Sequence, residues 1–471
     1  MSEIIAQINN IIWSVPFIAI CIMVGLYFSF QTGFLQFRYF REMLRLLFNE
    51  KNSNKGVSPF QAFSLAIAGR VGVGNMAGVA TAIAMGGPGA IFWMWLIAFL
   101  GSATAFAEAT LAQTYKTQID GEYRGGPAYY IEKGLGIKWY ANLFAIVSIL
   151  CCSFFLPGLQ ANNIGLAINE AFSIDTNYIA IILIFIVALV VIGSGKKIAK
   201  VAEIIVPFMA VTYIIMALII IGINYEKIPG VFDLIFKSAF NLESGMSGMI
   251  GSAILWGVKR GIYSNEAGQG SAPHAAAAAA TSHPAKQGLV QAFSVYIDTL
   301  LVCTATALII LFTGKYNIHH PDGGFIEENL PGIEPGSKFT IQAIAVHFPQ
   351  IADKFVASAI FLFAFTTIIA YYFIAESNIK YLFRKVPKIA VWSIRIILFI
   401  SIFTGIKATA GQAWDIGDIG VGLMAWVNLI ALFLLRKKVL LIFNDYKTQR
   451  KSKRNPVFNP KDIGIDRTEE W

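Results

Sequence analysis

The sequence contains little charge. Only 14% of its 471 residues are Asp, Glu, Lys or Arg, whereas 56% are hydrophobic and the mean hydropathy is +0.62. A soluble chain of this length carries about a quarter charged residues, so the composition excludes an ordinary soluble protein. Long apolar runs of roughly 20 residues predict membrane-spanning helices, because a β-barrel would show short alternating segments instead. We therefore expect an all-α polytopic membrane protein.

Residues that carry catalysis or bind metals are also scarce. The five histidines form no ligand cluster, and no H-E-x-x-H or G-x-S-x-G sequence occurs, so the pattern argues against an enzyme and an organic cofactor. No Gly-Lys-Ser/Thr follows the glycine-rich stretches, and no oxygen-rich filter loop typical of a channel is visible. The cysteines lie inside apolar segments without metal-ligand spacing, and we interpret them as packing residues: Cys21, Cys151, Cys152 and Cys303.

Apolar segments predict eleven spans. Glu3 replaces the basic region of a signal peptide, so the first segment reads as a retained span. An odd number of spans places the termini on opposite sides of the membrane. The segments lie near 11–30, 62–85, 91–113, 140–168, 177–194, 201–222, 245–273, 288–313, 355–383, 389–406 and 417–435.

The basic residues predict the orientation. With the C-terminus inside, 28 of the 37 Lys and Arg residues fall in cytoplasmic segments and 6 in outer ones. The N-terminus is then outside the cell membrane, and the basic stretch 436–454 contacts anionic lipid and not nucleic acid. We expect a peripheral helix and amphipathic segment at 1–60, a five-helix repeat at 61–223, a second repeat at 224–436, and a basic cytoplasmic tail at 437–471.

Two spans are interrupted by glycine at matching positions of the two halves. They read "AIAGRVGVGNMAGVATAIAMGGPG" (66–89) and "LWGVKRGIYSNEAGQGSAPHAAAAAA" (255–280). Because each half has five spans, the halves have opposite orientation, and interrupted spans at matching positions indicate the binding site of a transporter. Unwound backbone is tolerated in a membrane only where it lines a cavity or binds a ligand. Helix ends would suit the carboxylate of an amino acid and a small cation, although close helix packing also uses glycine.

Four long motifs resemble those of the alanine or glycine:cation symporter family. They are the two interrupted stretches, "RGGPAYYIEKGLG" (124–136) and "YIDTLLVCTATALIIL" (296–311). The resemblance implies the fold of the sodium-coupled leucine transporter, with two inverted five-helix repeats after one peripheral helix. It also implies sodium as coupling ion and alanine or glycine as substrate. The residues alone indicate a transporter of small solutes.

We expect the substrate at the two helix breaks. The backbone of the first break would bind the carboxylate, and Gln160 in the third core helix lies near the substrate in the family pattern. Trp256 would close the pocket from the second break and limit side-chain size, unless it is an interfacial anchor. Amides at this depth also hold helices together. The expected substrate residues are Gly72, Val73, Gly74, Asn75, Gln160, Trp256 and Gly257.

The resemblance also implies a sodium site. The hydroxyls of Thr366 and Thr367 would join the carbonyl oxygens of Ala68, Val71 and Phe363. The alternative is that each threonine bonds to a carbonyl of its own helix.

Three charges in the spans need a role, since an acid or base in a membrane is costly. Asp298 could bind a cation, carry a proton, or pair with Arg70, Lys259 or Arg260, and we favour the structural pair. We expect Glu108 to be structural and Arg70 to lie on the cytoplasmic side of the first break. The sequence therefore predicts sodium-coupled symport of alanine or glycine by alternating access. Proton coupling, or a larger neutral substrate such as glutamine, is the alternative.

Overall fold

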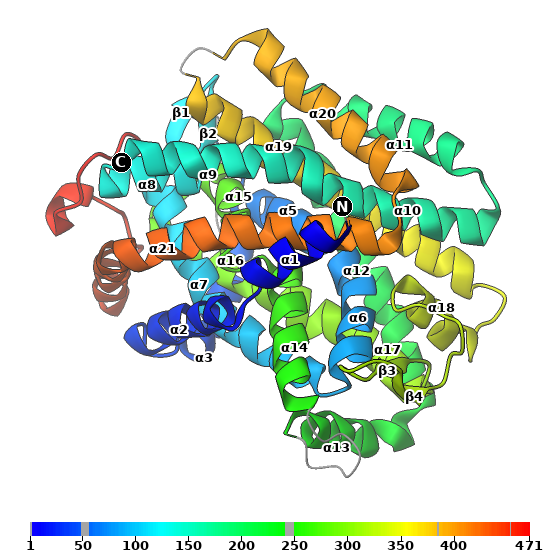
Figure 1. Cartoon of the computed structure of the whole chain (residues 1–471). Coiled ribbons are helices and arrows are strands. Elements are labelled where there is room, and N and C mark those ends of the chain that lie inside the picture. Colours follow the sequence, from blue (N-terminus) through cyan, green and yellow to red (C-terminus); the bar gives the residue numbers. More distant parts are fainter. Residues whose placement is uncertain (1, 49–55, 241–248, 384–385, 453) are drawn as a thin grey trace.

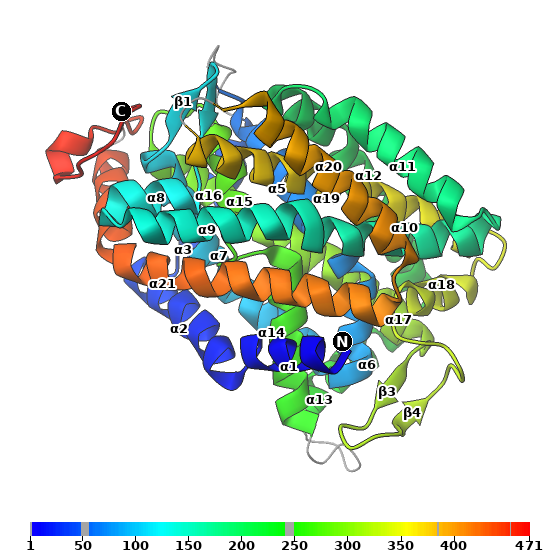
Figure 2. The ribbon, with the colours of Figure 1, turned by 45° about the horizontal axis from the view of Figure 1, so that its top comes forward.

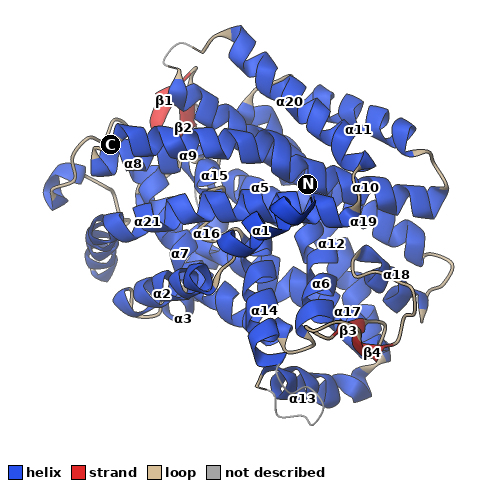
Figure 3. Ribbon diagram, in the orientation of Figure 1, coloured by secondary structure: helices blue, strands red, loops and turns tan. Residues whose placement is uncertain are grey.

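The chain folds into a bundle of helices with two short hairpins, as Figures 1 and 3 show. The computed structural model describes residues 2–48, 56–240, 249–383, 386–452 and 454–471. Each hairpin is an antiparallel pair of strands. The first joins β1 (Thr117–Ile119) to β2 (Glu122–Arg124), and the second joins β3 (Asn317–His319) to β4 (Phe325–Glu328). The expectation of an all-helical membrane protein is confirmed.

The helices of the first half follow the chain from α1 to α13. They are α1 (Ser2–Ile12), α2 (Val15–Gln31), α3 (Leu35–Arg38), α4 (Phe40–Phe48), α5 (Pro59–Arg70), α6 (Ala77–Gly86), α7 (Ala90–Thr114), α8 (Pro127–Leu135), α9 (Lys138–Leu150), α10 (Leu156–Phe172), α11 (Thr176–Val191), α12 (Gly195–Ile223) and α13 (Ile228–Ala239). Short turns of other helix types also occur: η1 (Val73–Asn75), η2 (Cys151–Phe155) and η3 (Tyr225–Lys227).

The second half contains the remaining helices. They are α14 (Met249–Asn265), α15 (Ala272–Ala278), α16 (Pro284–Val295), α17 (Thr304–Thr313), α18 (Ser337–Ala345), α19 (Ala352–Leu382), α20 (Lys388–Lys407) and α21 (Ala410–Lys451), with η4 (Tyr296–Cys303) and η5 (Pro460–Ile463). The π-helical turns η2 and η4 lie inside the continuous runs α9–α10 and α16–α17.

Within the described residues, eight helices are long and apolar enough to cross a membrane. They are Ile4–Gln31, Ala90–Thr114, Lys138–Phe172, Gly195–Ile223, Pro284–Thr313, Ala352–Leu382, Lys388–Lys407 and Ala410–Lys451. The three other expected spans do not meet this criterion of length and hydropathy, and the structure shows why. Segments 62–85 and 245–273 are interrupted, and α11 has only 16 residues, about 24 Å at 1.5 Å per residue.

The first interrupted span leaves the helix at Val71 and Gly72. Ser58 and Gln61 form a capping box that starts α5, and α5 ends at Arg70. Val71 has φ −79° and ψ 89°, a combination outside the helical region. One turn of 3₁₀ helix then follows before α6 begins. The break therefore lies where the sequence predicts it.

The second interruption lies later than expected. Helix α14 continues to Asn265, and residues 266–271 are unwound before α15. Gly268 and Gly270 have φ of +87° and +86°, the left-handed region that favours glycine. The expectation that Trp256 and Gly257 lie in this break is wrong, because both are inside α14.

The two interrupted spans lie in the interior of the bundle. Helix α5 packs against α12, α15 and α19, while α7 packs against α14, α15 and α16. The long α10 lies between α19 and α20, and α2 lies at an edge beside α7 and α21. In Figures 1 and 2 the β1–β2 hairpin, α8 and the C-terminal segment gather at one end, and α13, α18 and the β3–β4 hairpin at the other.

Candidate substrate and cation site

The first break is held by two amide side chains. The Oδ1 atom of Asn75 accepts the backbone N–H of Gly72 at 2.9 Å, and Oε1 of Gln160 on α10 accepts that of Val73 at 3.1 Å. A Cβ atom at Gly72 would lie 2.7 Å from the hydroxyl oxygen of Thr367 and 2.9 Å from Oε1 of Gln160. A side chain at this position would have to displace one or both of these groups. The structure thus brings Gly72, Val73, Asn75 and Gln160 together, all buried.

Gly74 completes this turn and faces the second interrupted span. A Cβ atom at Gly74 would lie 3.0 Å from the ring of Tyr263 on α14. The neighbouring amide side chains of α10 form hydrogen bonds to backbone carbonyls elsewhere. Asn162 donates to the carbonyls of Gly405 and Ala408, and Asn163 donates to that of Leu159. Interhelical bonding therefore accounts for Asn162, whereas Gln160 contacts the break.

Four of the five expected oxygen atoms meet between α5 and α19, namely the Thr367 hydroxyl and the carbonyls of Ala68, Val71 and Phe363. The hydroxyl of Thr367 donates to the carbonyl of Ala68 at 2.8 Å, and lies 3.4 Å from that of Val71 and 2.9 Å from that of Phe363. The hydroxyl of Thr366 lies 2.9 Å from the same Phe363 carbonyl and 3.0 Å from that of Leu362, its own helix. All five residues are buried. Carbonyl oxygens at the end of a half-helix, joined by hydroxyls, form a donor set that can coordinate sodium.

Asp298 lies on η4 and joins the two interrupted spans. Its carboxylate accepts hydrogen bonds from Asn75 at 2.7 Å, from Ser264 of α14 at 2.8 Å and from Thr299 at 2.7 Å. It forms no ion pair within the described ranges, so the expected pair with Arg70, Lys259 or Arg260 is wrong. Three neutral donors satisfy the carboxylate instead of a cation.

The three basic residues have other partners. Arg260 forms a bidentate pair with Asp418 of α21 at 2.8 and 3.1 Å, and Lys259 lies 2.8 Å from the same carboxylate. Arg70 donates to the hydroxyl of Ser294 and, at 3.3 Å, to the carbonyl of Gln291 on α16. In the part of the chain that is described, its Nε and Nη2 atoms have no hydrogen-bond partner.

Glu108 of α7 caps the second break. Its carboxylate accepts the backbone N–H of Gly268 at 3.0 Å and of Gly270 at 2.9 Å, and Asn428 donates to it at 2.6 Å. These bonds satisfy polar groups that the unwound backbone leaves open, so the structural interpretation of Glu108 agrees with its contacts. Glu266, in the same break, accepts from Ser271 at 2.6 Å and lies beside Gly69.

Trp256 packs on basic side chains of its own helix, and Gly257 packs on α7. The Trp256 ring lies 5.1 Å from the Lys259 ammonium and 5.2 Å from the Arg260 guanidinium. A Cβ atom at Gly257 would lie 2.5 Å from the Ala90 carbonyl oxygen, so this glycine allows α14 to approach α7 closely.

A cluster of aromatic and charged side chains covers the breaks on the α6 and α14 side. The Arg260 guanidinium lies 4.2 Å from the centre of the Trp414 ring, and Trp414 packs against Tyr263 with ring centres 5.2 Å apart. Beyond Trp414 lies a cavity of about 470 Å³ that also contacts Asn163 and Lys338. Sequence reasoning missed Asp418, Trp414 and Glu266, although Glu266 is the only acid in the second glycine-rich motif.

A membrane-embedded bundle in which two interrupted helices meet at their breaks defines a class of secondary transporter that binds its solute between them. Residues 1–460 match the sodium:alanine symporter family. The chain belongs to this family, and it is therefore a transporter and not an enzyme.

Three relatives are similar over almost their whole length. YrbD of Bacillus subtilis (strain 168), provisionally named a sodium/proton-dependent alanine carrier protein, is 54% identical, covering 100% of this chain and 98% of that protein. The sodium/proton-dependent alanine carrier protein of Bacillus sp. (strain PS3) is 47% identical, covering 91% and 97%. GlnT of Bacillus subtilis, provisionally named a sodium/glutamine symporter, is 44% identical, covering 97% and 93%.

A solved structure shares the fold. The manganese transporter of Eremococcus coleocola superposes with a TM-score of 0.55 at 14% identity, covering 86% of this chain and 83% of that one. This likeness shows the fold alone, which is of the leucine-transporter class.

Proposed function

We propose that this protein is a sodium-coupled symporter of a small neutral amino acid, alanine or glycine, in the cell membrane. The observation that carries the proposal is the contact of the Thr367 hydroxyl with the carbonyls of Ala68 and Val71. A cation there would tie α19 to the unwound end of α5. Binding of the ion would thereby order the backbone that receives the substrate, which is a physical route to coupling.

In this proposal the substrate carboxylate binds the backbone N–H groups of Gly72, Val73 and Gly74. Gln160 and Asn75 already accept two such N–H groups, and they would exchange these bonds for bonds to the amino acid. The close approach of Gln160 and Thr367 to Gly72 leaves little room, which favours a small side chain. Trp256 and Gly257 do not line the pocket themselves in this proposal, and they limit it only through the position of α14.

The proposed architecture comprises eleven spans: the eight long helices, the interrupted pairs α5–α6 and α14–α15, and the short α11. Residues 61–223 and 224–436 form two inverted repeats, preceded by a peripheral segment at 1–60 and followed by the tail at 437–471. The N-terminus is outside and the C-terminus inside, as the excess of Lys and Arg favours.

Two alternatives have support of their own. The names of two relatives include the proton as well as sodium, and Asp298 is a buried acid that contacts Asn75 at the break. The name of a third relative includes glutamine. Proton coupling and glutamine transport are therefore the rival hypotheses.

Uptake of labelled alanine into proteoliposomes that contain the purified protein tests the proposal. We expect uptake to follow an inward sodium gradient and not an equal potassium gradient, and unlabelled glycine to compete. Uptake driven only by a pH gradient would refute sodium coupling and favour Asp298 as the ion site. Sodium-driven uptake of glutamine with no alanine uptake would refute the substrate assignment while keeping the ion.

A further inference from the structure

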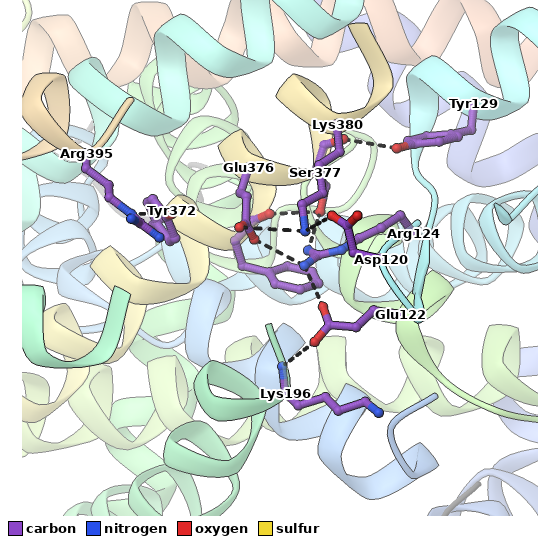
Figure 4. A network of polar contacts seen from close by, with 11 residues as sticks. Asp120, Glu122, Arg124, Tyr129, Lys196, Tyr372, Glu376, Ser377, Lys380 and Arg395 are labelled. Atoms are coloured by element: carbon purple, nitrogen blue, oxygen red, sulfur yellow. Dashed lines mark hydrogen bonds and ion pairs between the residues drawn. The ribbon is translucent and has the colours of Figure 1, made fainter. Parts of the chain in front are cut away.

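A polar network joins the β1–β2 hairpin to α19 and α12 (Figure 4). Arg124 of β2, fully buried, lies 2.7 Å from Glu122 and 3.1 Å from Glu376, and donates to the hydroxyl of Ser377 at 3.0 Å. The backbone N–H of Lys196 on α12 donates to Glu122 at 3.4 Å. The carboxylates of this network are thus already bound by Arg124 and by backbone.

A cavity of about 460 Å³ adjoins this network, between the end of α19 and the start of α20. Its lining includes Lys380, Lys388, Trp392 and Arg395, together with the carboxylates of Asp120 and Glu376. Lys380 lies 3.4 Å from Asp120 and 3.8 Å from Glu376, so both acids have cationic partners.

Two cations of the cavity remain without a carboxylate among the residues described here. Lys388 is exposed at the first position of α20. Arg395 makes one hydrogen bond, from Nε to the hydroxyl of Tyr372 at 2.9 Å, and its guanidinium lies 5.1 Å from the centre of the Trp392 ring. Figure 4 shows Arg395 and Tyr372 beside the acidic network. The terminal amino groups of Arg395 can therefore form the paired hydrogen bonds that a phosphate accepts.

The surroundings of these cations are apolar. Arg395 lies seven residues into α20, about 10 Å along the helix from Lys388. Three large apolar side chains on the same stretch are uncovered: Ile389 is 75% exposed, Trp392 46% and Ile396 52%. In a membrane-spanning helix this surface faces lipid, with tryptophan at the level of the headgroups.

We propose that this cavity binds the phosphate of an anionic phospholipid, with Arg395 and Lys388 on the headgroup and the acyl chains along α20. In the orientation proposed above, this end of α20 is cytoplasmic, and a basic pocket between spans at that surface suits such a headgroup. A dissolved phosphate would match the cations equally well, but it would leave Ile389, Trp392 and Ile396 uncovered. Because the cavity shares Lys380 and Glu376 with the Arg124 network, lipid bound there contacts the joint between hairpin and α19.

Native mass spectrometry of the purified full-length protein, with phosphatidylglycerol or phosphatidylcholine added, tests this proposal. We expect preferential retention of phosphatidylglycerol, and each of the substitutions R395Q and K388Q to weaken it about fivefold, as about 1 kcal/mol per basic residue implies. K407Q is the matched control, because Lys407 ends the same helix at the opposite side. It should retain phosphatidylglycerol like the unmodified protein.

The outcomes separate the sources of phosphate. Equal retention of phosphatidylglycerol by the R395Q, K388Q and K407Q proteins would overturn the proposed site. Displacement of the lipid by millimolar inorganic phosphate would overturn the lipid in favour of a dissolved anion. If R395Q does not fold, K388Q alone decides, because Lys388 is exposed and its loss leaves the helix packing intact.

Discussion

The carboxylate of Glu108 accepts the backbone N–H of Gly268 at 3.0 Å, so a side chain of α7 caps the interruption in another helix. Gly268 has a left-handed backbone, and its N–H group cannot find a partner within a regular helix. The bond explains how unwound backbone persists in an apolar interior, where an unpaired N–H group is costly.

We expect Glu108→Ala to lower the free energy of unfolding by about 2–4 kcal/mol, because it leaves the N–H groups of Gly268 and Gly270 unpaired and removes one of the two acceptors of the Asn428 amide. Thermal unfolding in detergent measures the change. Glu328→Ala, which removes an exposed carboxylate on β4, should shift the midpoint little. Equal shifts in the two variants would show that the cap contributes nothing specific.

Thr366 and Thr367 should differ in their effect on transport. Thr367→Ala removes the hydroxyl that contacts both Ala68 and Val71, and we expect it to abolish sodium stimulation of uptake while the protein stays in the membrane. Thr367→Ser keeps the oxygen and should retain stimulation. Thr366→Ala, whose hydroxyl contacts two carbonyls of its own helix and the sulfur of Met209 but no carbonyl of α5, should weaken apparent sodium affinity less. The sodium dependence of initial uptake rates decides, and an unaltered Thr367→Ala protein contradicts the proposed ion site.

A methyl group at position 72 should block the site. Gly72→Ala places a carbon 2.7 Å from the Thr367 hydroxyl, and we expect uptake to fall about fivefold or more, as overpacking by about 1–3 kcal/mol implies. Gly222→Ala in α12 is the control, because nothing lies within 4 Å of its added carbon. Binding of labelled alanine to purified protein distinguishes lost binding from slow transport. A Gly72→Ala protein with normal binding would exclude this break as the substrate site.

The cluster at Asp418 should depend on its charge. Asp418→Asn leaves Lys259 and Arg260 buried without a carboxylate, a change that typically costs about 3–5 kcal/mol. We expect a marked fall in the thermal midpoint. Asp415→Asn, which weakens one hydrogen bond to Asn9, should lower it far less. Similar midpoints would mean that the two cations do not need the pair.

The C-terminal segment should detach in acid. Burial alone would raise the pKa of the Glu469 carboxyl, but the Thr117 hydroxyl and Lys133, 2.9 Å away, hold the pKa below its usual value. A lowered pKa contributes stability above the ordinary value, and that stability is lost as the pH falls through the lowered one. We therefore expect the segment to resist trypsin at pH 7, and its amide exchange to rise below about pH 4. Glu469→Gln should make exchange independent of this titration.

The sequence indicates both interrupted helices, but it does not distinguish the reasons for their glycines. Gly257 and Gly261 allow α14 to pack on α7, where a Cβ atom at Gly261 would lie 2.4 Å from Ile97. Gly268 supplies positive φ in the break. Glycine serves both close helix packing and positive φ, and the hydropathy of the segment does not distinguish the two roles. The predicted position of the second break was therefore wrong by about ten residues.

The partners of the buried charges could not be predicted either. Lys259 and Arg260 form ion pairs with Asp418, which is more than 150 residues later in the sequence, and no local sequence pattern indicates this contact. Asp298 is satisfied by hydroxyl and amide donors, which are common throughout the chain. In contrast, the contacts of Thr367 with the carbonyls of Ala68 and Val71 agree with the expectation that the resemblance to the leucine-transporter fold implies.

The buried thiol of Cys303 allows exposure of the site to be measured. Its sulfur lies 3.3 Å from the amide nitrogen of Asn75 and 3.1 Å from the hydroxyl of Ser264, and all four cysteines of the chain are buried. A water-soluble thiol reagent therefore reaches Cys303 only when the bundle opens beside the first break. Its alkylation rate, followed at different sodium and alanine concentrations, reports how often the native protein exposes its centre, without any engineered label.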